Sequence, residues 1–128
     1  MNKFVIDASV LLAYIRKENC LEDLSLILPY SIMSTVNYAE VIAVLSDHSM
    51  PQEVIDLTIP TMIYEIVPFD SAQANITGQL REKSKAKGLS LGDRACLALG
   101  QMMQLPVYTA DRIWSQVKIE GVEVRLIR

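Results

Sequence analysis

Short apolar runs alternate with stretches of helical periodicity along the chain, and this alternation restricts the possible folds more than any other feature. Strands are expected at the apolar runs, which cover residues 3–7, 31–34, 64–68, 106–109 and 122–127. Helices are predicted between them, at residues 8–16, 21–28, 36–46, 51–59, 70–87, 90–103 and 112–117. Strands that alternate with helices form parallel sheets, so the sequence predicts an α/β fold.

Length and composition favour one folded domain, residues 1–128, with 51% hydrophobic residues, which excludes a largely disordered chain. The only cysteines, Cys20 and Cys96, are far apart and are expected to be free, buried thiols. Asp7 interrupts the first apolar run, so we expect no secretory signal. No run approaches the roughly 18 apolar residues of a membrane span. We therefore expect a cytoplasmic protein with no membrane partner.

Charge is divided unevenly along the chain, although the net value is only −3. Residues 1–69 carry three basic and nine acidic side chains, a balance of −6, and residues 70–128 carry nine and six, a balance of +3. The segment 81–87 holds four of these positive charges against one negative. Such a run fits a solvated helix face, and it also fits a rim that contacts phosphate.

Four carboxylates occupy apolar surroundings or follow an apolar run directly. Asp7 ends the first strand, and Glu40 has no charged neighbour within residues 38–44. Asp93 opens an apolar helical stretch, and Asp111 follows the strand at 106–109. Acidic side chains are rarely buried unless they are paired or bind metal. A turn or helix cap could explain Asp7, and it is the favoured local explanation of Asp93 and Asp111, whereas Glu40 and Asp7 stand out because of their apolar neighbours.

The expected topology brings the four carboxylates together. Asp7 and Asp111 follow strands, and Glu40 and Asp93 are expected in first turns of helices that begin at the same edge, where ligands of parallel sheets bind. Four ionised carboxylates at one edge would repel one another. A divalent cation removes this repulsion, and a few hard oxygen ligands suit Mg²⁺ or Mn²⁺. Because such ions support hydrolysis of phosphodiesters, the sequence predicts a metal-dependent nuclease.

Four segments, each containing one of these carboxylates, resemble the acidic motifs of PIN-domain nucleases. The segments are Val5-Ile6-Asp7-Ala8-Ser9-Val10-Leu11, Asn37-Tyr38-Ala39-Glu40-Val41, Leu89-Ser90-Leu91-Gly92-Asp93-Arg94-Ala95 and Val107-Tyr108-Thr109-Ala110-Asp111-Arg112. The four segments occur in the order and at the spacing of the family and span essentially the whole chain. The small size of the chain is similar to that of VapC toxins from bacterial toxin–antitoxin pairs. The resemblance implies three layers, α/β/α, around a parallel sheet of four or five strands.

The same resemblance implies an Mg²⁺- or Mn²⁺-dependent endoribonuclease that cuts transfer or ribosomal RNA, arrests translation and is inhibited by a cognate antitoxin. It also implies a homodimer, with operator DNA bound only through the antitoxin. Asp7, Glu40, Asp93 and Asp111 would be the catalytic and metal-binding residues. Some relatives carry a further acidic residue after the last motif, where this chain has residues 113–116 without one. We therefore expect one firm metal site.

Residues next to the carboxylates have two interpretations each. The hydroxyls of Ser9 and Thr109 either hold metal-bound water or belong to an ordinary turn and strand. Arg94 and Arg112 are candidates for substrate contact, Arg112 the better one, although a lone arginine more often points into solvent. Trp114 either stacks on an RNA base or packs in the core.

Two other classes of protein compete with the nuclease. A phosphoacceptor signalling domain is also a small α/β fold with an acidic pocket, but it needs adjacent acidic residues after the first strand and a lysine after the last. Asp7 stands alone, and residues 122–126 contain no lysine. A non-catalytic PIN-like scaffold would usually have lost one of the carboxylates, and all four are present here.

Overall fold

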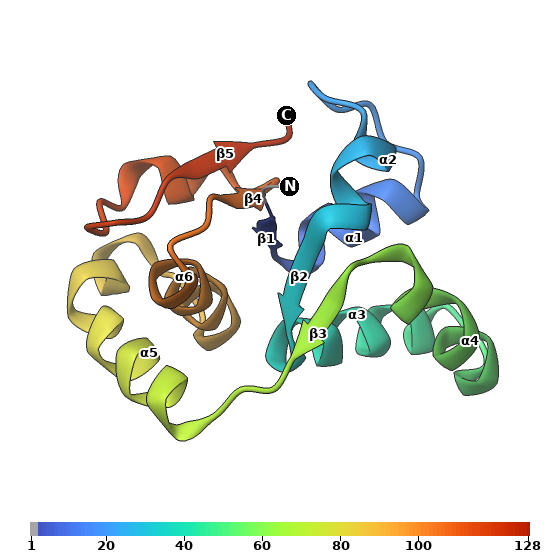
Figure 1. Cartoon of the computed structure of the whole chain (residues 1–128), viewed down its shortest axis with the longest axis horizontal. Helices are drawn as coiled ribbons and strands as arrows, with labels where there is room; N and C mark the ends of the chain where they lie inside the picture. The colour runs from blue at the N-terminus through green and yellow to red at the C-terminus, as the bar shows by residue number, and fades with distance from the viewer. Residues whose placement is uncertain (1–2) are drawn as a thin grey trace.

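The computed structural model describes residues 3–128, which form a parallel five-stranded sheet covered by helices on both faces (Figure 1). The strands are β1 (Phe4–Ile6), β2 (Ser31–Ser34), β3 (Glu65–Val67), β4 (Val107–Thr109) and β5 (Val124–Leu126). Their order is β3-β2-β1-β4-β5, and every neighbouring pair is parallel. The predicted α/β class is confirmed, with five strands.

Helices from the two halves of the chain cover opposite faces of the sheet. The α-helices are α1 (Ala8–Ile15), α2 (Leu24–Ile27), α3 (Thr35–Asp47), α4 (Gln52–Met62), α5 (Ser71–Ser84) and α6 (Leu91–Met103). Successive strand residues point to opposite faces, so Ile6 packs in the core with α1 to α4 while Val5 packs in the core with α5 and α6. The strands are therefore buried on both sides, as expected for a parallel sheet.

Three of the helices begin directly after a side chain that caps them. The side chains of Ser34, Asp70 and Ser90 accept hydrogen bonds from the first turns of α3, α5 and α6 respectively. At the other end of the α5 segment, Gly88 adopts a left-handed conformation with φ of 69°. Glycine adopts this conformation without the steric cost of a Cβ, so the predicted stop is confirmed.

Three expected elements differ in extent or type. The helix expected at 21–28 is limited to α2 and is followed by a 3₁₀ turn, η1 (Leu28–Tyr30), which contains Pro29. Helix α4 continues past Ile59 to Met62 with Pro60 inside it, and the proline removes one backbone hydrogen bond from its last turn. The residues after β4 form a 3₁₀ helix, η3 (Arg112–Gln116).

None of the helices within residues 3–128 combines the length and apolar character needed to cross a membrane. Both thiols of this part of the chain are free, with Cys96 buried and Cys20 partly buried.

Packing of α6 on β4 generates a test of the fold. A Cβ at Gly100 would lie 2.3 Å from Val107 Cγ2, whereas a Cβ at exposed Gly78 in α5 would meet nothing within 4 Å. Gly100→Ala should lower the free energy of unfolding by about 1–3 kcal/mol through overpacking. Gly78→Ala should raise it by about 0.5–1 kcal/mol, because alanine favours a helix interior. Urea unfolding of both variants measures the difference, and equal effects would contradict this packing.

Candidate functional site

The chain adds strands first on one side of β1 and then, from β4 on, on its other side. Two of the predicted acidic residues lie between β1 and β4, where this change occurs. From β1 the chain builds β2 and β3 on one side, and β4 and β5 on the other. In doubly wound sheets this switch point, at the carboxyl ends of the strands, is where ligands bind. Asp7 directly follows β1, and Asp111 follows β4 after one intervening residue.

Asp7 is a buried carboxylate without a cationic partner. Its side chain is 6% exposed, and no lysine, arginine or histidine of residues 3–128 forms an ion pair with it. Oδ1 accepts hydrogen bonds from Ser9 Oγ at 2.5 Å and from the backbone N–H of Val10 at 3.3 Å, and Oδ2 accepts one from Thr109 Oγ1 at 2.8 Å. Burial raises the pKa of Asp7 to about 6; these hydrogen bonds oppose the increase, and the nearby charge of Asp93 adds to it.

The hydroxyls of Ser9 and Thr109 connect Asp7 to the segment that leads to Asp111. Ser9 Oγ accepts the backbone N–H of Ala110 at 2.9 Å, and Thr109 Oγ1 accepts that of Asp111 at 3.1 Å. Each hydroxyl therefore donates to Asp7 and accepts from the chain after β4. In this structure their contacts are with the Asp7 carboxylate itself, and contact with metal-bound water, one of the two interpretations from the sequence, stays a prediction.

Glu40 lies in the second turn of α3 and is exposed, so the sequence-based expectation of a buried first-turn residue was wrong. Its apolar neighbours in sequence point to other sides of the helix. The carboxyl group nevertheless lies against α6: a Cβ at Gly92 would be 2.6 Å from Glu40 Oε2. Asn37, whose side chain is buried, donates from Nδ2 to Glu40 Oε1 at 2.8 Å. No role of Asn37 was predicted from the sequence, although its spacing of three from Glu40 places both on one helix face.

Asp93 begins α6 as part of a capping box. Its Oδ2 accepts the backbone N–H of Ser90 at 2.9 Å, and Ser90 Oγ accepts the N–H of Asp93 at 3.1 Å. Asp93, Asp7 and Glu40 all raise the pKa of the Cys96 thiol, after the larger effect of its burial. The three carboxylates therefore lie within electrostatic range of the Cys96 thiol.

Asp111 is exposed and is the N-cap residue of η3, where its Oδ1 accepts the N–H of Ile113 at 3.0 Å. All four carboxylates thus reach the same edge of the sheet, each engaged in a local hydrogen bond. Among the residues described, no three acidic, histidine or cysteine side chains are arranged to hold one ion in these rotamers. The donor chemistry still fits a hard divalent cation, because all donors are oxygens and the buried carboxylate of Asp7 has no counter-charge.

The remaining predicted residues lie in different environments. Arg94 is buried and donates from Nη1 to the Thr77 carbonyl at 3.0 Å, so it ties α6 to α5 and does not suit the expected substrate contact. Trp114 is fully buried, so it packs in the core and cannot stack on an exposed base. Arg112 is exposed beside Asp111, as a substrate contact requires.

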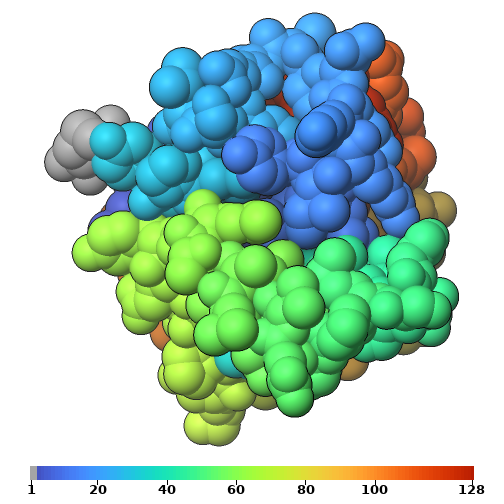
Figure 2. Space-filling model, turned by 90° about the vertical axis from the view of Figure 1, so that its right-hand side faces the viewer, coloured from blue at the N-terminus to red at the C-terminus, as the bar shows by residue number. Residues whose placement is uncertain are grey.

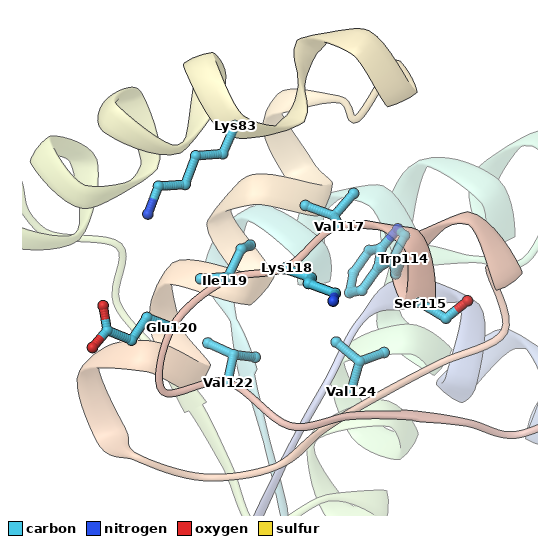
Figure 3. Close-up of a pocket in the computed structure, with 9 residues that line it drawn as sticks. All are labelled: Lys83, Trp114, Ser115, Val117, Lys118, Ile119, Glu120, Val122 and Val124. Atoms are coloured by element: carbon cyan, nitrogen blue, oxygen red, sulfur yellow. The ribbon is translucent and has the colours of Figure 1, made fainter.

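A hollow lies between α5, η3 and the segment after η3 (Figure 3). It is a groove of about 540 Å³ lined by Lys83, Lys118 and Glu120 together with apolar side chains, and none of the four carboxylates lines it. The acidic residues instead occupy an open edge of the sheet.

The fold and the site define a doubly wound α/β protein with an acidic cluster at its switch point. The PIN domain family model matches residues 4–120, so the chain belongs to the PIN-domain family and the resemblance seen in its motifs is confirmed. Among curated protein sequences, none matches the chain significantly.

Solved structures of toxin–antitoxin complexes contain chains with the same fold. A chain of VapBC2 from Rickettsia felis, bound to a DNA fragment from its promoter, is 14% identical with a TM-score of 0.72, and the match covers 98% of both chains. A chain of DNA-bound VapBC from Salmonella typhimurium is 19% identical with a TM-score of 0.70 and the same coverage. A chain of VapBC-5 from Mycobacterium tuberculosis is 22% identical with a TM-score of 0.64, covering 100% of this chain and 99% of the other.

The strand order also argues against the phosphoacceptor alternative. Phosphoacceptor domains of the flavodoxin-like type have the order 2-1-3-4-5, whereas this sheet has the order 3-2-1-4-5.

The raised pKa of Asp7 predicts how stability depends on pH in the absence of metal. Asp7 binds a proton more tightly in the folded state, so its contribution to stability is full below pH 3.8 and is lost as pH rises through about 6. The difference between 3.8 and about 6 corresponds to roughly 3 kcal/mol. Denaturant unfolding between about pH 4 and about pH 7 should therefore show Asp7→Asn gaining stability relative to wild type as pH rises. A pH-independent difference between the two proteins would contradict the burial of an uncompensated carboxylate.

Proposed function

We propose that this protein is a metal-dependent endoribonuclease that acts as the toxin of a type II toxin–antitoxin pair. The observation that carries the proposal is Asp7, a buried carboxylate at the switch point with no counter-charge, whose pKa is raised further by the nearby charge of Asp93. A site of this kind favours a cation, and a cation there favours a phosphodiester substrate.

The four carboxylates have distinct parts in this proposal. Asp7, Glu40, Asp93 and Asp111 would hold Mg²⁺ or Mn²⁺. When bound, the ion supplies neutralisation of phosphate charge and activation of water for hydrolysis. Asp7 is the buried member, oriented by three hydrogen bonds, whereas Glu40 and Asp111 are exposed.

Neighbouring residues would orient the site and the substrate. Ser9 and Thr109 fix the Asp7 carboxylate and the backbone before Asp111 through the hydrogen bonds described above. Exposed Arg112 would contact a phosphate of the RNA next to the cut. The basic segment 81–87, whose Lys87 Nζ donates to Gln116 Oε1 of η3 at 3.2 Å, lies close enough to η3 to continue that contact.

The activity is tested by cleavage of transfer and ribosomal RNA by the purified protein. Cleavage should require Mg²⁺ or Mn²⁺, stop in excess chelator, and fall at least about 100-fold in Asp7→Asn. Asparagine keeps an acceptor for the α1 cap, so the loss would report on charge. Asp47→Asn, an exposed acidic residue at the end of α3, is the matched control and should cleave normally.

Full cleavage in chelator, or by Asp7→Asn, would exclude the proposed mechanism. Binding of RNA without cleavage under any metal condition would favour the alternative of a non-catalytic PIN-like scaffold.

An antitoxin partner is supported by apolar side chains exposed on α1, α2 and α4. Tyr14, Leu26 and Leu57 are 39%, 70% and 76% exposed. These three helices lie side by side on one face (Figure 2), and a shallow hollow there is lined by Tyr14, Ser25, Leu28, Pro29 and Met62. Exposed apolar patches of this kind mark protein interaction sites.

The proposal includes a homodimer, contact with operator DNA only through the antitoxin, and action in the cytoplasm.

The toxin assignment predicts an effect on growth. Expression of the chain alone in bacteria should arrest growth, because cleavage of transfer or ribosomal RNA stops translation, and co-expression of the antitoxin encoded beside it should restore growth. Asp93→Asn is the control and should be harmless at the same protein level. Growth is measured by optical density together with the amount of soluble protein. Normal growth with abundant, soluble and catalytically active wild type would exclude the toxin role while leaving the nuclease in place.

A further inference from the structure

Asn37 is a buried polar residue whose side-chain hydrogen bonds, within the part of the chain described, go to Glu40 and to the first turn of α6. It is the third residue of α3 and only 1% exposed. Its Nδ2 donates to Glu40 Oε1 at 2.8 Å and to the Gly92 carbonyl at 3.1 Å, so both amide protons are used. Both neighbours are pure acceptors, which fixes the orientation of the amide group.

The other end of the same amide is unsatisfied. Asn37 Oδ1 is buried and has no hydrogen-bond partner among the residues described. A buried acceptor without a partner costs about 1–3 kcal/mol. An apolar residue would avoid this cost, and native structures that keep such a group require an explanation. The explanation that fits the contacts is the bond to Glu40.

Gly92 shapes the other side of the Glu40 carboxyl group. A Cβ at this position would lie 2.6 Å from Oε2, 2.8 Å from Oε1 and 2.8 Å from Cδ of Glu40. Glycine in a helix costs roughly 0.5–1 kcal/mol relative to alanine, so its place in the first turn of α6 also needs a reason. The absence of a side chain lets the carboxyl group lie directly on the helix, one residue before Asp93.

We propose that Asn37 is a positioning residue for the metal centre, holding the Glu40 carboxyl group on Gly92 and beside Asp93. Oε1 is occupied by the amide, and no residue between 3 and 128 donates a hydrogen bond to Oε2, which is left to bind the cation. Glu40 is otherwise an exposed, flexible side chain, and the amide gives it a fixed position without adding a competing charge. This inference rests on the proposed metal-dependent function.

A purely structural role for Asn37 makes a different prediction. The bond to the Gly92 carbonyl ties α3 to α6, and its loss alone would lower stability without affecting the affinity for metal. The test therefore measures metal binding without RNA, together with the free energy of unfolding.

The experiment is calorimetric titration of the full chain with Mn²⁺. Asn37→Ala should weaken binding by about 10- to 100-fold, as loss of a group that orients a metal ligand typically does. Gly92→Ala should weaken it in the same direction, because its methyl group displaces only the flexible end of Glu40 and leaves the fold intact. Gly78→Ala, a glycine-to-alanine change in open space on α5, is the matched control and should bind as wild type does.

A double-mutant cycle shows whether Asn37 acts through Glu40. In a Glu40→Gln background, Asn37→Ala should cause little further loss of Mn²⁺ affinity, since the group that it positions is already removed. Its effect on the free energy of unfolding should persist there, because the tie to Gly92 is independent of the charge on residue 40.

The outcomes separate this inference from the function on which it rests. Wild type that binds no Mn²⁺ would overturn both. Wild type that binds Mn²⁺ while the folded Asn37→Ala and Gly92→Ala variants bind equally well would overturn the positioning role alone. Additive losses from Asn37→Ala and Glu40→Gln would also overturn it.

Discussion

The burial of one carboxylate, that of Asp7, is the constraint on which the rest of the site depends. Desolvation opposes its ionised form, and hydrogen bonds from Ser9, Thr109 and Val10 offset only part of that effect. The group lies at the point of the sheet where the chain connections diverge, which is the usual ligand site of such folds. The fold therefore keeps a buried carboxylate in a place that favours a cation.

Much of this architecture could be predicted from the sequence, because it is encoded by near neighbours. A strand ends where Asp7 interrupts the apolar residues, and helices begin at Ser34, Asp70 and Ser90, whose side chains reach N–H groups two or three residues later. These signals act within one turn of chain. Because strands alternate with helices along the chain, the strands pair in parallel, and their carboxyl ends lie at one edge of the sheet.

Exposure and side-chain direction were predicted less well, since they depend on packing between distant segments. Apolar neighbours of Glu40 in sequence spread around α3, so they say little about what covers Glu40 itself. Arg94 looked like a surface residue beside the site, yet the close contact of α5 and α6 encloses it against the Thr77 carbonyl. Asn37 was missed because its second partner, the Gly92 carbonyl, lies 55 residues away.

Two of the four carboxylates also cap helices, Asp7 for α1 and Asp111 for η3, and Asp93 completes the capping box of Ser90 at the start of α6. Each such cap contributes about 1 kcal/mol to folding. A descendant of this chain that lost its enzymatic activity would still lose stability on replacing them, so selection for folding alone would preserve much of the acidic pattern. Glu40 caps no helix, so its replacement would cost no capping energy, and it is the carboxylate that such a descendant would lose first. Its identity is therefore the more discriminating sign of an active enzyme among proteins built on this scaffold.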